Sequence, residues 1–414
     1  MRRINLNVKK NKAHICLVYQ SEFPEIGEIR LFKIYNALIK NNFNVSILCK
    51  KINKQGKRLW FYSGRDIKLN DISSLCPSWI LKEASPFNPF WTWAMLKLNK
   101  VSKIDLFIVR GMRLVLPTVA ASRLLSCPVI ADMSENFVGL AKLAKNYNKN
   151  LKWWQKQIRN RIFVRILEYF SVKLADFIWV VIDENKKRYI SWGIPPNKIE
   201  VVSNVPEIEY SLDTENNEYD SNIFDKSEKL IYMGWISPER GLDIVIESMQ
   251  FILKKIPSAE LIIAGSDRGQ GYLSDLKNLA TKIGISDKIR FIDYSTPSDI
   301  KELIKNCCIG LVPHRINELT NTTIPNKLFD YMAAGIPVAS TPMKPVERII
   351  KETGAGIVIP CDPRGMAESL CALLIDKAKL KEMGMNARNA ILKKYNWEIE
   401  SKSLLQSITM LINK

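Results

Sequence analysis

Short apolar runs alternate with amphipathic helical stretches along almost the whole chain, and this alternation constrains the fold more than any other feature. The first half has six such runs, at 14–20, 44–50, 106–110, 128–133, 177–182 and 199–204. The second half has six more, at 229–234, 260–265, 288–293, 308–313, 336–341 and 356–360. Strands that alternate with helices are typical of βαβ units and parallel sheets. The pattern therefore predicts an α/β protein with two Rossmann-like domains that face a central cleft.

A boundary between the two domains is predicted where the periodicity stops. Residues 206–228 are acidic and polar, which is typical of a linker. We therefore expect a first domain at 1–205, a second at 229–385, and a closing helical segment at 386–414. Because ligands of such sheets bind beyond the carboxyl ends of the strands, functional residues are expected in the loops that lead from strands into helices.

Composition excludes several classes of protein. Hydrophobic residues make up 47% of the 414 residues, yet no run of about 18 apolar residues occurs, so no membrane-spanning helix is predicted. The basic N-terminus has only a short apolar patch, which favours a first strand over a signal peptide. The eight cysteines form no C-x-x-C pair, and the only histidines are His14 and His314. We therefore expect neither a disulfide framework nor a metal site, and a reducing cytoplasm fits.

The charge of the chain is divided unevenly. Residues 1–200 contain 35 Lys and Arg against 14 Asp and Glu, whereas residues 201–414 contain 26 against 28. A lysine-rich composition spread evenly would not produce this asymmetry, so the first half is expected to meet an anionic partner. Nucleic acid is the rival interpretation, but none of its usual binding modules is recognisable, and we predict no nucleic-acid partner.

Residues 141–170 concentrate much of this charge, with eight Lys and Arg and no acid before Glu168. Five of the basic residues are spaced by four, three, four and three, which places them on one helical face: Lys145, Lys149, Lys152, Lys156 and Arg159. Trp153 and Trp154 add rings suited to a membrane interface. This composition predicts a helix lying on an anionic membrane surface, at about 1 kcal/mol per basic residue. The alternative is a solvated basic helix whose tryptophans pack on the domain.

Two stretches of the second half indicate an anion site. In GWISPERGLDIVIES (234–248), a strand ends at Gly234 and Arg240 precedes the start of a helix, where backbone amides attract anions. In TIPNKLFDYMAAGIPVAST (323–341), Pro325 suits a first helical turn and Gly335 suits the end of the helix.

The second stretch carries an unusual cation. The amides of Asn326, Lys327 and Leu328 would face the helix N-terminus, where the Lys327 charge opposes the helix dipole. A bound diphosphate would reverse that penalty, and Asp330 could bond a ribose or sugar diol. For both stretches the alternative is an exposed, solvated surface.

These stretches resemble the GT-B glycosyltransferases of family 4, which are retaining and use nucleotide sugars. The string DYMAAGIPV (330–338) matches the family's second element, and PNKLFDYMA (325–333) matches a recognisable subgroup. NVPE (204–207) and Trp397 in the closing segment are also similar. The resemblance covers nearly the whole chain and is most specific over 229–341. It implies a GT-B fold whose C-terminal helix packs back toward the first domain.

The resemblance also implies site residues. The implied donor-binding set is Gly27, Gly234, Arg240, Gly265, Pro325, Asn326, Lys327, Leu328 and Asp330. Catalysis is assigned to Arg240 at the basic diphosphate position, to Lys327, and to Asp330, which takes the place of the acid that bonds the ribose. In the string DMSEN (132–136), Asp132 and Glu135 are candidate acids of the cleft or acceptor site.

Three positions depart from the family pattern. Thr322 stands where the first acid is usual, Trp235 where an arginine follows the glycine, and Ser134 where histidine is common. We predict a metal- and cofactor-independent enzyme that moves a sugar from a nucleoside-diphosphate sugar to a lipid-linked or polysaccharide acceptor. It would act in cell-surface glycan synthesis, peripherally attached to the inner face of the cell membrane. The departures keep open a second hypothesis, an inactive GT-B-shaped partner or regulatory subunit of a glycan-assembly complex.

Overall fold

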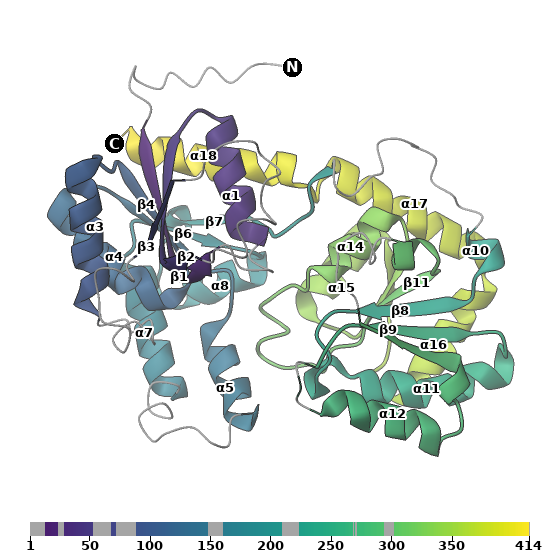
Figure 1. Ribbon diagram of the computed structural model, residues 1–414. Helices are drawn as coiled ribbons and strands as arrows, with labels where there is room; N and C mark the ends of the chain where they lie inside the picture. The colour runs from purple at the N-terminus through teal and green to yellow at the C-terminus, as the bar shows by residue number, and fades with distance from the viewer. Residues whose placement is uncertain are drawn as a thin grey trace. The chain divides into compact units, whose positions relative to one another are not determined.

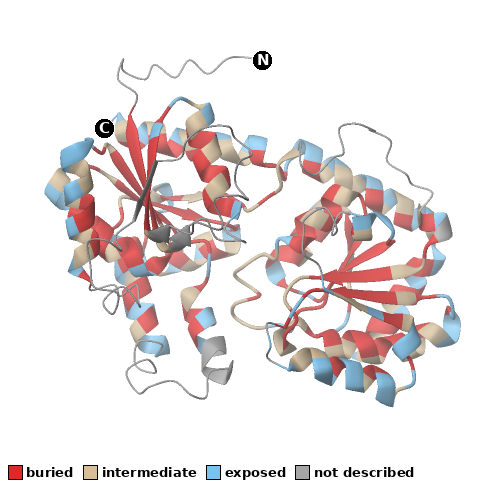
Figure 2. Ribbon diagram, in the orientation of Figure 1, coloured by how far each residue is buried: buried red, intermediate tan, exposed pale blue. Residues whose placement is uncertain are grey.

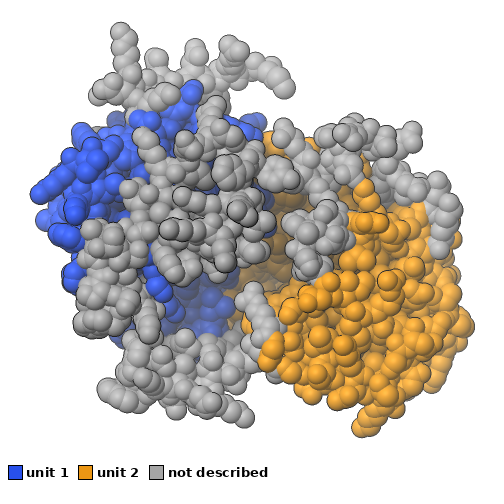
Figure 3. All heavy atoms as spheres, viewed as in Figure 1, with its two compact units in different colours: residues 1–203, 401–414 blue, residues 204–400 orange. Residues whose placement is uncertain are grey.

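The structure is a computed structural model that describes residues 13–23, 29–52, 68–71, 88–147, 160–208, 223–267, 269, 271–293 and 302–413. The chain forms two compact units (Figure 3). Unit 1 comprises residues 1–203 and 401–414, and unit 2 comprises residues 204–400. Of the predicted linker, residues 209–222 lie outside the described residues, and the remainder belongs to unit 2.

Unit 1 contains a parallel sheet of seven strands in the order β3-β2-β1-β4-β5-β6-β7 (Figure 1). The strands are β1 (His14–Phe23), β2 (Asn44–Ile52), β3 (Lys68–Asp71), β4 (Leu106–Arg110), β5 (Val129–Asp132), β6 (Phe177–Val180) and β7 (Ile199–Val201). The helices are α1 (Ile29–Lys40), α3 (Pro89–Val101), α4 (Val115–Leu125), α5 (Phe137–Tyr147), α7 (Arg161–Leu174) and α8 (Asp183–Ser191). All residues of β5 and β6 are buried, as expected for strands covered on both faces.

Unit 2 contains a parallel sheet of six strands in the order β10-β9-β8-β11-β12-β13. The strands are β8 (Lys229–Met233), β9 (Glu260–Ala264), β10 (Ile289–Ile292), β11 (Ile309–Val312), β12 (Val338–Ser340) and β13 (Gly356–Val358). The helices are α10 (Ile223–Lys226), α11 (Leu242–Lys255), α12 (Tyr272–Lys282), α14 (Lys327–Ala334), α15 (Lys344–Thr353), α16 (Pro363–Ile375) and α17 (Lys377–Lys393). Figure 2 shows that the strands of both sheets are mostly buried.

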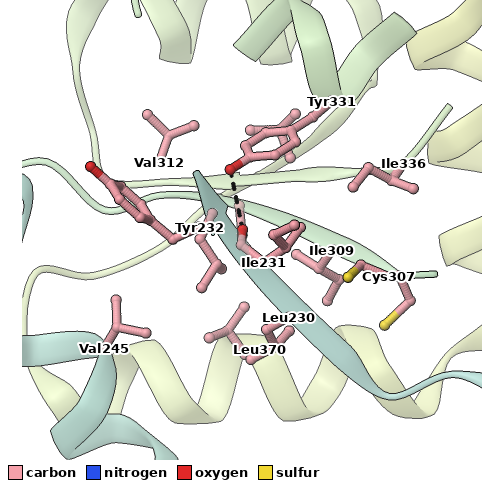
Figure 4. Packing of buried hydrophobic residues seen from close by; sticks show 14 of the residues in the cluster. Leu230, Ile231, Tyr232, Val245, Cys307, Ile309, Val312, Tyr331, Ile336 and Leu370 are labelled. Carbon is pink, nitrogen blue, oxygen red and sulfur yellow. Dashed lines mark hydrogen bonds between the residues drawn. The ribbon is translucent and has the colours of Figure 1, made fainter. Parts of the chain in front are cut away.

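The core of unit 2 fixes α14 against the sheet. Aliphatic side chains of β8 and β11 pack with Tyr331 of α14, whose hydroxyl donates to the Ile231 carbonyl at 3.2 Å (Figure 4). Gly310 of β11 makes this close approach possible, because a Cβ there would lie 2.3 Å from the Tyr331 ring. The first turn of α14 is thereby held at the carboxyl ends of the strands.

The last helix, α18 (Trp397–Ile412), begins in unit 2 and continues in unit 1 from Ser401. In unit 1 the Trp179 indole of β6 donates to the Ser407 hydroxyl at 2.9 Å. Residues 386–393 of the predicted closing segment belong instead to α17 of unit 2.

The predicted fold class, two Rossmann-like α/β domains with parallel sheets, is confirmed. A strand forms at each of the twelve predicted apolar runs. The structure adds β3, whose residues KLND are too polar to predict a strand but pair in parallel with β2. This strand exists because of its neighbour rather than because of its own sequence.

Candidate functional site

Two strand ends of unit 2 approach each other closely at the candidate site. After β8 the chain turns at Gly234 (φ 118°), whose amide donates to the Ala264 carbonyl at 2.9 Å. After β9 it turns at Gly265 (φ 154°), where a Cβ would lie 1.9 Å from the Gly234 oxygen. Only glycine fits between these loops. Both predicted glycines therefore shape the carboxyl edge of the sheet.

Lys327, the first residue of α14, points toward this edge. Its ammonium lies 3.6 Å from the centroid of the Tyr232 ring and 3.3 Å from where a Cβ of Gly234 would be. The residue is 9% exposed, and its Nζ has no hydrogen-bond partner among the described residues. Burial lowers the pKa of Lys327 well below its usual value, Arg240 lowers it further, and Asp330 partly opposes the shift. A buried cation without a partner is costly, so this position suits an incoming anion.

Arg240 lies beside the same edge, at the end of the short helix Pro238–Arg240. Its Nη1 is 3.2 Å from each ring nitrogen of His314, which follows β11 and is 2% exposed. Burial, Lys327 and Arg240 together hold the pKa of His314 well below 6.5, so the ring is neutral at pH 7. The neutral imidazole can accept one hydrogen bond from Arg240 without adding charge.

The loop that carries Arg240 is fixed at its other end. Gly241 adopts φ 65°, and a Cβ there would lie 2.2 Å from the Pro313 oxygen. Arg315 donates to the Pro238 oxygen at 3.0 Å and forms an ion pair with Asp243 of α11. Arg240 therefore sits on a loop braced by its neighbours.

The N-terminus of α14 differs from the prediction in one respect. The Leu328 amide donates to the Pro325 carbonyl at 3.1 Å, so it does not face an anion as predicted. The reason is that the first turn of α14 is tightened by a hydrogen bond in which the amide of residue i+3 donates to the carbonyl of residue i. Asn326 is exposed and its Oδ1 accepts from Asn204 at 2.8 Å, which leaves the amides of Asn326 and Lys327 as candidates. Asp330 is half-buried, one turn further along α14.

At two of the positions that depart from the pattern of the resembled family, 235 and 322, the residue present forms a hydrogen bond with a neighbour in the chain. Trp235 is half-buried, and its carbonyl accepts from the Tyr232 hydroxyl at 2.6 Å. The Thr322 hydroxyl donates to the Glu318 carbonyl at 2.7 Å. Position 235 therefore supplies no cation. The Lys327 ammonium of α14 instead lies beside Gly234, the residue that precedes Trp235 in the chain.

In unit 1, the predicted cleft acid Asp132 is fully buried. Its carboxylate accepts from Arg30 Nη2 at 2.8 Å and from Arg110 Nη1 at 3.0 Å. Burial acts to raise the pKa of Asp132, but the two guanidinium groups outweigh it and hold the pKa below its usual value. Arg110 also donates to Ser134 at 2.7 Å. Asp132 is thus engaged in an internal ion-pair network and does not present its carboxylate to a ligand, whereas Glu135 is exposed.

Several predicted residues belong to the part of the chain that the structure does not describe. Gly27 lies outside the described residues, as do Lys149, Lys152, Trp153, Trp154, Lys156 and Arg159 of the predicted membrane face. Lys145 lies in α5, where only its backbone is described. The described residues contain no helix long and apolar enough to cross a membrane, and no group of three or more His, Cys, Asp or Glu arranged to hold a metal ion.

Sequence reasoning missed Tyr232 and His314. Tyr232 lies inside a buried strand, and its sequence context therefore indicates a residue of the hydrophobic core. His314 follows β11 by two residues, so its place in a strand-to-helix loop was the available signal. Its contact with Arg240, 74 residues away, could not be derived from local pattern.

Comparisons with known proteins concern the sequence and the fold of the chain. Residues 213–390 match the family model "Glycosyl transferases group 1". An uncharacterised glycosyltransferase of Methanocaldococcus jannaschii is 25% identical over 243 residues, which cover 57% of this chain and 60% of that protein. The phosphatidyl-myo-inositol mannosyltransferase of Mycobacterium tuberculosis is 19% identical over 187 residues, covering 44% of this chain and 47% of that protein. The chain thus spans 40–60% of the length of the first curated relatives it matches.

Solved structures extend the likeness to both units. HepE of Anabaena, solved in complex with UDP, has a TM-score of 0.73 at 14% identity over 96% of this chain and 100% of that chain. A glycosyltransferase of Rickettsia africae has a TM-score of 0.72 at 14% identity over 98% of this chain and 99% of that chain. At this identity the likeness concerns the fold. Residues 213–390 are therefore similar in sequence to the group 1 glycosyl transferases, and the chain has the fold of the GT-B glycosyltransferases.

Proposed function

We propose that the protein is a retaining glycosyltransferase that uses a nucleoside-diphosphate sugar as donor. The observation that carries the proposal is the Lys327 ammonium, which is buried, has no hydrogen-bond partner among the described residues, and lies beside Gly234 at the carboxyl edge of the sheet. Arg240 adds a second cation next to it. A diphosphate is the anion that best matches two adjacent cations at a helix N-terminus.

The same groups would assist the chemical step. When the bond between the anomeric carbon and the diphosphate oxygen breaks, negative charge grows on the leaving group. Fixed cations and amides aimed at that position stabilise the developing charge. Arg240 and Lys327 would supply this stabilisation without a metal ion, and Asp330 would accept hydrogen bonds from the nucleotide ribose. Transfer that survives a metal chelator is the expected outcome.

His314 has a supporting role in this proposal. Because the His314 ring is buried and neutral, it can orient the Arg240 guanidinium without repelling an incoming anion and without competing with that anion for the guanidinium charge. A histidine that titrated near pH 7 would change the charge of the site with pH. The environment of His314 avoids this, so Arg240 keeps one orientation across the physiological range.

The relatives support a sugar-transfer activity. The curated relatives named above are glycosyltransferases, one of which is a mannosyltransferase with a lipid in its name, and HepE was solved with UDP. We propose a lipid-linked or polysaccharide acceptor in cell-surface glycan synthesis, with the enzyme attached peripherally to the cytoplasmic face of the membrane. The excess of basic residues in the first half supports an anionic membrane as partner.

The donor assignment is tested by isothermal titration of UDP, GDP and ADP into the wild type and Arg240→Ala. The wild type should bind at least one of them, and loss of the charge-assisted bonds should weaken that binding by about 10- to 150-fold. Arg364→Ala is a matched control, because Arg364 is an exposed arginine that also lies against an aromatic ring, 5.6 Å from Phe251. Equal binding by Arg240→Ala and wild type, or no binding by either, contradicts the proposal.

Membrane attachment is tested separately by vesicle flotation. Charge reversal at Lys149, Lys152 and Lys156 should release the protein from phosphatidylglycerol vesicles if this segment contributes to attachment. Unchanged flotation would remove these residues from the proposal.

A second candidate function is an inactive partner of a glycan-assembly complex. Thr322 and Trp235 favour it, because the Thr322 hydroxyl is bonded to a backbone carbonyl and Trp235 supplies no charge. Mass spectrometry of products formed by the purified protein from a set of nucleotide sugars separates the two. Neither transfer nor hydrolysis of any donor that binds would favour the inactive partner.

A further inference from the structure

Helix α7 of unit 1 exposes a row of large apolar side chains. Ile162, Ile166, Phe170 and Leu174 are four residues apart and are 70%, 51%, 46% and 44% exposed. A spacing of four places them in one continuous row along the helix. Isolated exposed apolar residues are normal on a protein surface, but a contiguous row marks an interaction surface. We call these four residues the α7 row.

The opposite face of α7 holds the helix firmly on the domain. Val164, Leu167 and Val172 belong to the core of unit 1, and α5 packs alongside (Figure 1). At the start of α7, Asn160 caps the helix by accepting a hydrogen bond from the Ile162 amide at 2.9 Å. The α7 row is therefore the outer face of a fixed helix, and Figure 2 shows exposed positions along it.

A row of cationic and aromatic residues runs beside the α7 row: Arg161, Arg165, Tyr169 and Lys173. The Arg165 guanidinium lies 5.8 Å from the centroid of the Trp192 ring. The Lys173 ammonium lies 5.3 Å from the centroid of the Tyr169 ring and donates to its hydroxyl at 3.2 Å. Cations next to aromatic and aliphatic groups suit the headgroup region of a bilayer.

The exposed surface of α7 carries no negative charge. Its single acid, Glu168, is fully buried and bonded by Arg188 and by the Tyr189 hydroxyl, the latter at 2.6 Å. The unit as a whole is strongly basic, since residues 1–203 and 401–414 contain 37 Lys and Arg against 14 Asp and Glu. A second copy packed symmetrically on the α7 row would bring these cations together. An anionic partner is favoured instead.

We propose that the α7 row inserts into an anionic lipid bilayer while Arg161, Arg165 and Lys173 bind lipid phosphates. The row extends from Ile162 to Leu174, which is 13 residues or about 18 Å of helix, and this is too short to cross a hydrocarbon core of about 30 Å. The helix therefore lies along the membrane surface. This inference deepens the membrane attachment in the proposed function, but it rests on α7 and needs neither the donor site nor the basic segment before the helix.

Flotation of the full chain with vesicles tests it. Ile166→Ser with Phe170→Ser should lower the partition coefficient for vesicles of phosphatidylcholine and phosphatidylglycerol by at least about tenfold. Arg161→Glu with Lys173→Glu should also weaken it, and phosphatidylcholine alone should bind the wild type less. Leu124→Ser is the matched control, since Leu124 is an exposed leucine of α4 in the same unit, and it should float like the wild type.

Two further measurements keep the test decisive. Nucleoside-diphosphate binding should be unchanged in every α7 variant, which separates a lost membrane contact from a misfolded protein and from a failed donor assignment. Sedimentation should show a monomer before and after substitution. The proposal is overturned if the variant with Ile166→Ser and Phe170→Ser floats with the vesicles as strongly as the wild type. A wild-type dimer that this variant dissociates also overturns it, because a second copy would then occupy the row.

Discussion

Replacing Lys327 with methionine should stabilise the free protein and weaken donor binding. The substitution removes an ammonium that is buried, lacks a hydrogen-bond partner among the described residues, and lies over the Tyr232 ring and beside Gly234. Methionine has a similar length and packs well against an aromatic ring. The two effects have opposite signs, which a residue with a purely structural role would not produce.

The magnitude follows from two competing terms. An unpaired buried cation costs several kcal/mol, and the contact with Tyr232 returns about 2 kcal/mol of this. We therefore expect Lys327→Met to raise the free energy of unfolding of unit 2 by about 1–3 kcal/mol. For a unit of this size the midpoint of thermal unfolding should rise by about 3–9 °C. Loss of a charge-assisted bond to phosphate should weaken diphosphate binding by about 2–3 kcal/mol, or about 30- to 150-fold.

Differential scanning calorimetry without ligand and isothermal titration with the bound nucleoside diphosphate measure the two quantities. Lys254→Met is the control, because Lys254 is an exposed lysine 5.6 Å from the centroid of the Phe251 ring. It should change neither quantity appreciably. A lower unfolding midpoint for Lys327→Met together with unchanged affinity would refute the reasoning, since Lys327 would then stabilise the fold rather than await an anion.

Three other predictions follow from the described contacts. The pKa of Lys327 is lowered in the free protein and a bound anion would raise it, so binding of a diphosphate should take up a proton at any pH between these two pKa values. In that range affinity should fall by up to about tenfold per pH unit as the pH rises in the wild type but not in Lys327→Met, as measured by titration calorimetry. Gly265→Ala should destabilise unit 2 by at least about 3 kcal/mol in urea unfolding, because its Cβ would meet the Gly234 oxygen, whereas Gly284→Ala, with open space around it, should cost about 1 kcal/mol. Asp132→Asn should lower the free energy of unfolding by about 3–5 kcal/mol, because the buried Arg30 guanidinium would lose its anionic partner. The folded-state pKa of Asp132 is lowered, so the stability from this ion pair is present above pH 3.8 and is lost as the pH falls. The difference in stability between wild type and variant should therefore shrink in acid unfolding curves.

Local pattern was sufficient for the fold because buried parallel strands read as apolar runs whatever lies beside them. It failed at β3, where polar residues join the sheet by pairing with β2. At the candidate site, the positions of Arg240 and Lys327 could be predicted, because Arg240 precedes a helix and Lys327 lies in the first turn of one. Asp132 was placed in the cleft by its motif, but Arg30, 102 residues earlier in the chain, bonds its carboxylate in the interior. Contacts between distant segments decided each of these differences.

We propose that Lys327 supplies part of the positive charge that Trp235 lacks. In the family pattern an arginine follows the glycine after the first strand, but here Trp235 follows Gly234, and the Lys327 ammonium lies 3.3 Å from where a Gly234 Cβ would be. If both positions serve one spot, Trp235→Arg should restore part of the diphosphate binding lost in Lys327→Met. We expect a recovery of about tenfold, because a guanidinium at the half-buried position 235 would be more accessible to water than the buried Lys327 and would therefore bind phosphate less strongly.

The converse variant sharpens this prediction. Trp235→Arg alone would place a third cation beside Lys327 and Arg240, so it should lower the unfolding midpoint of the free protein, and added diphosphate should reverse the loss. Calorimetric titration and thermal unfolding of the single and double variants form one double-mutant cycle. Additive effects on binding would mean that positions 235 and 327 act on different parts of the ligand, and the proposal that Lys327 supplies charge that Trp235 lacks would then be wrong.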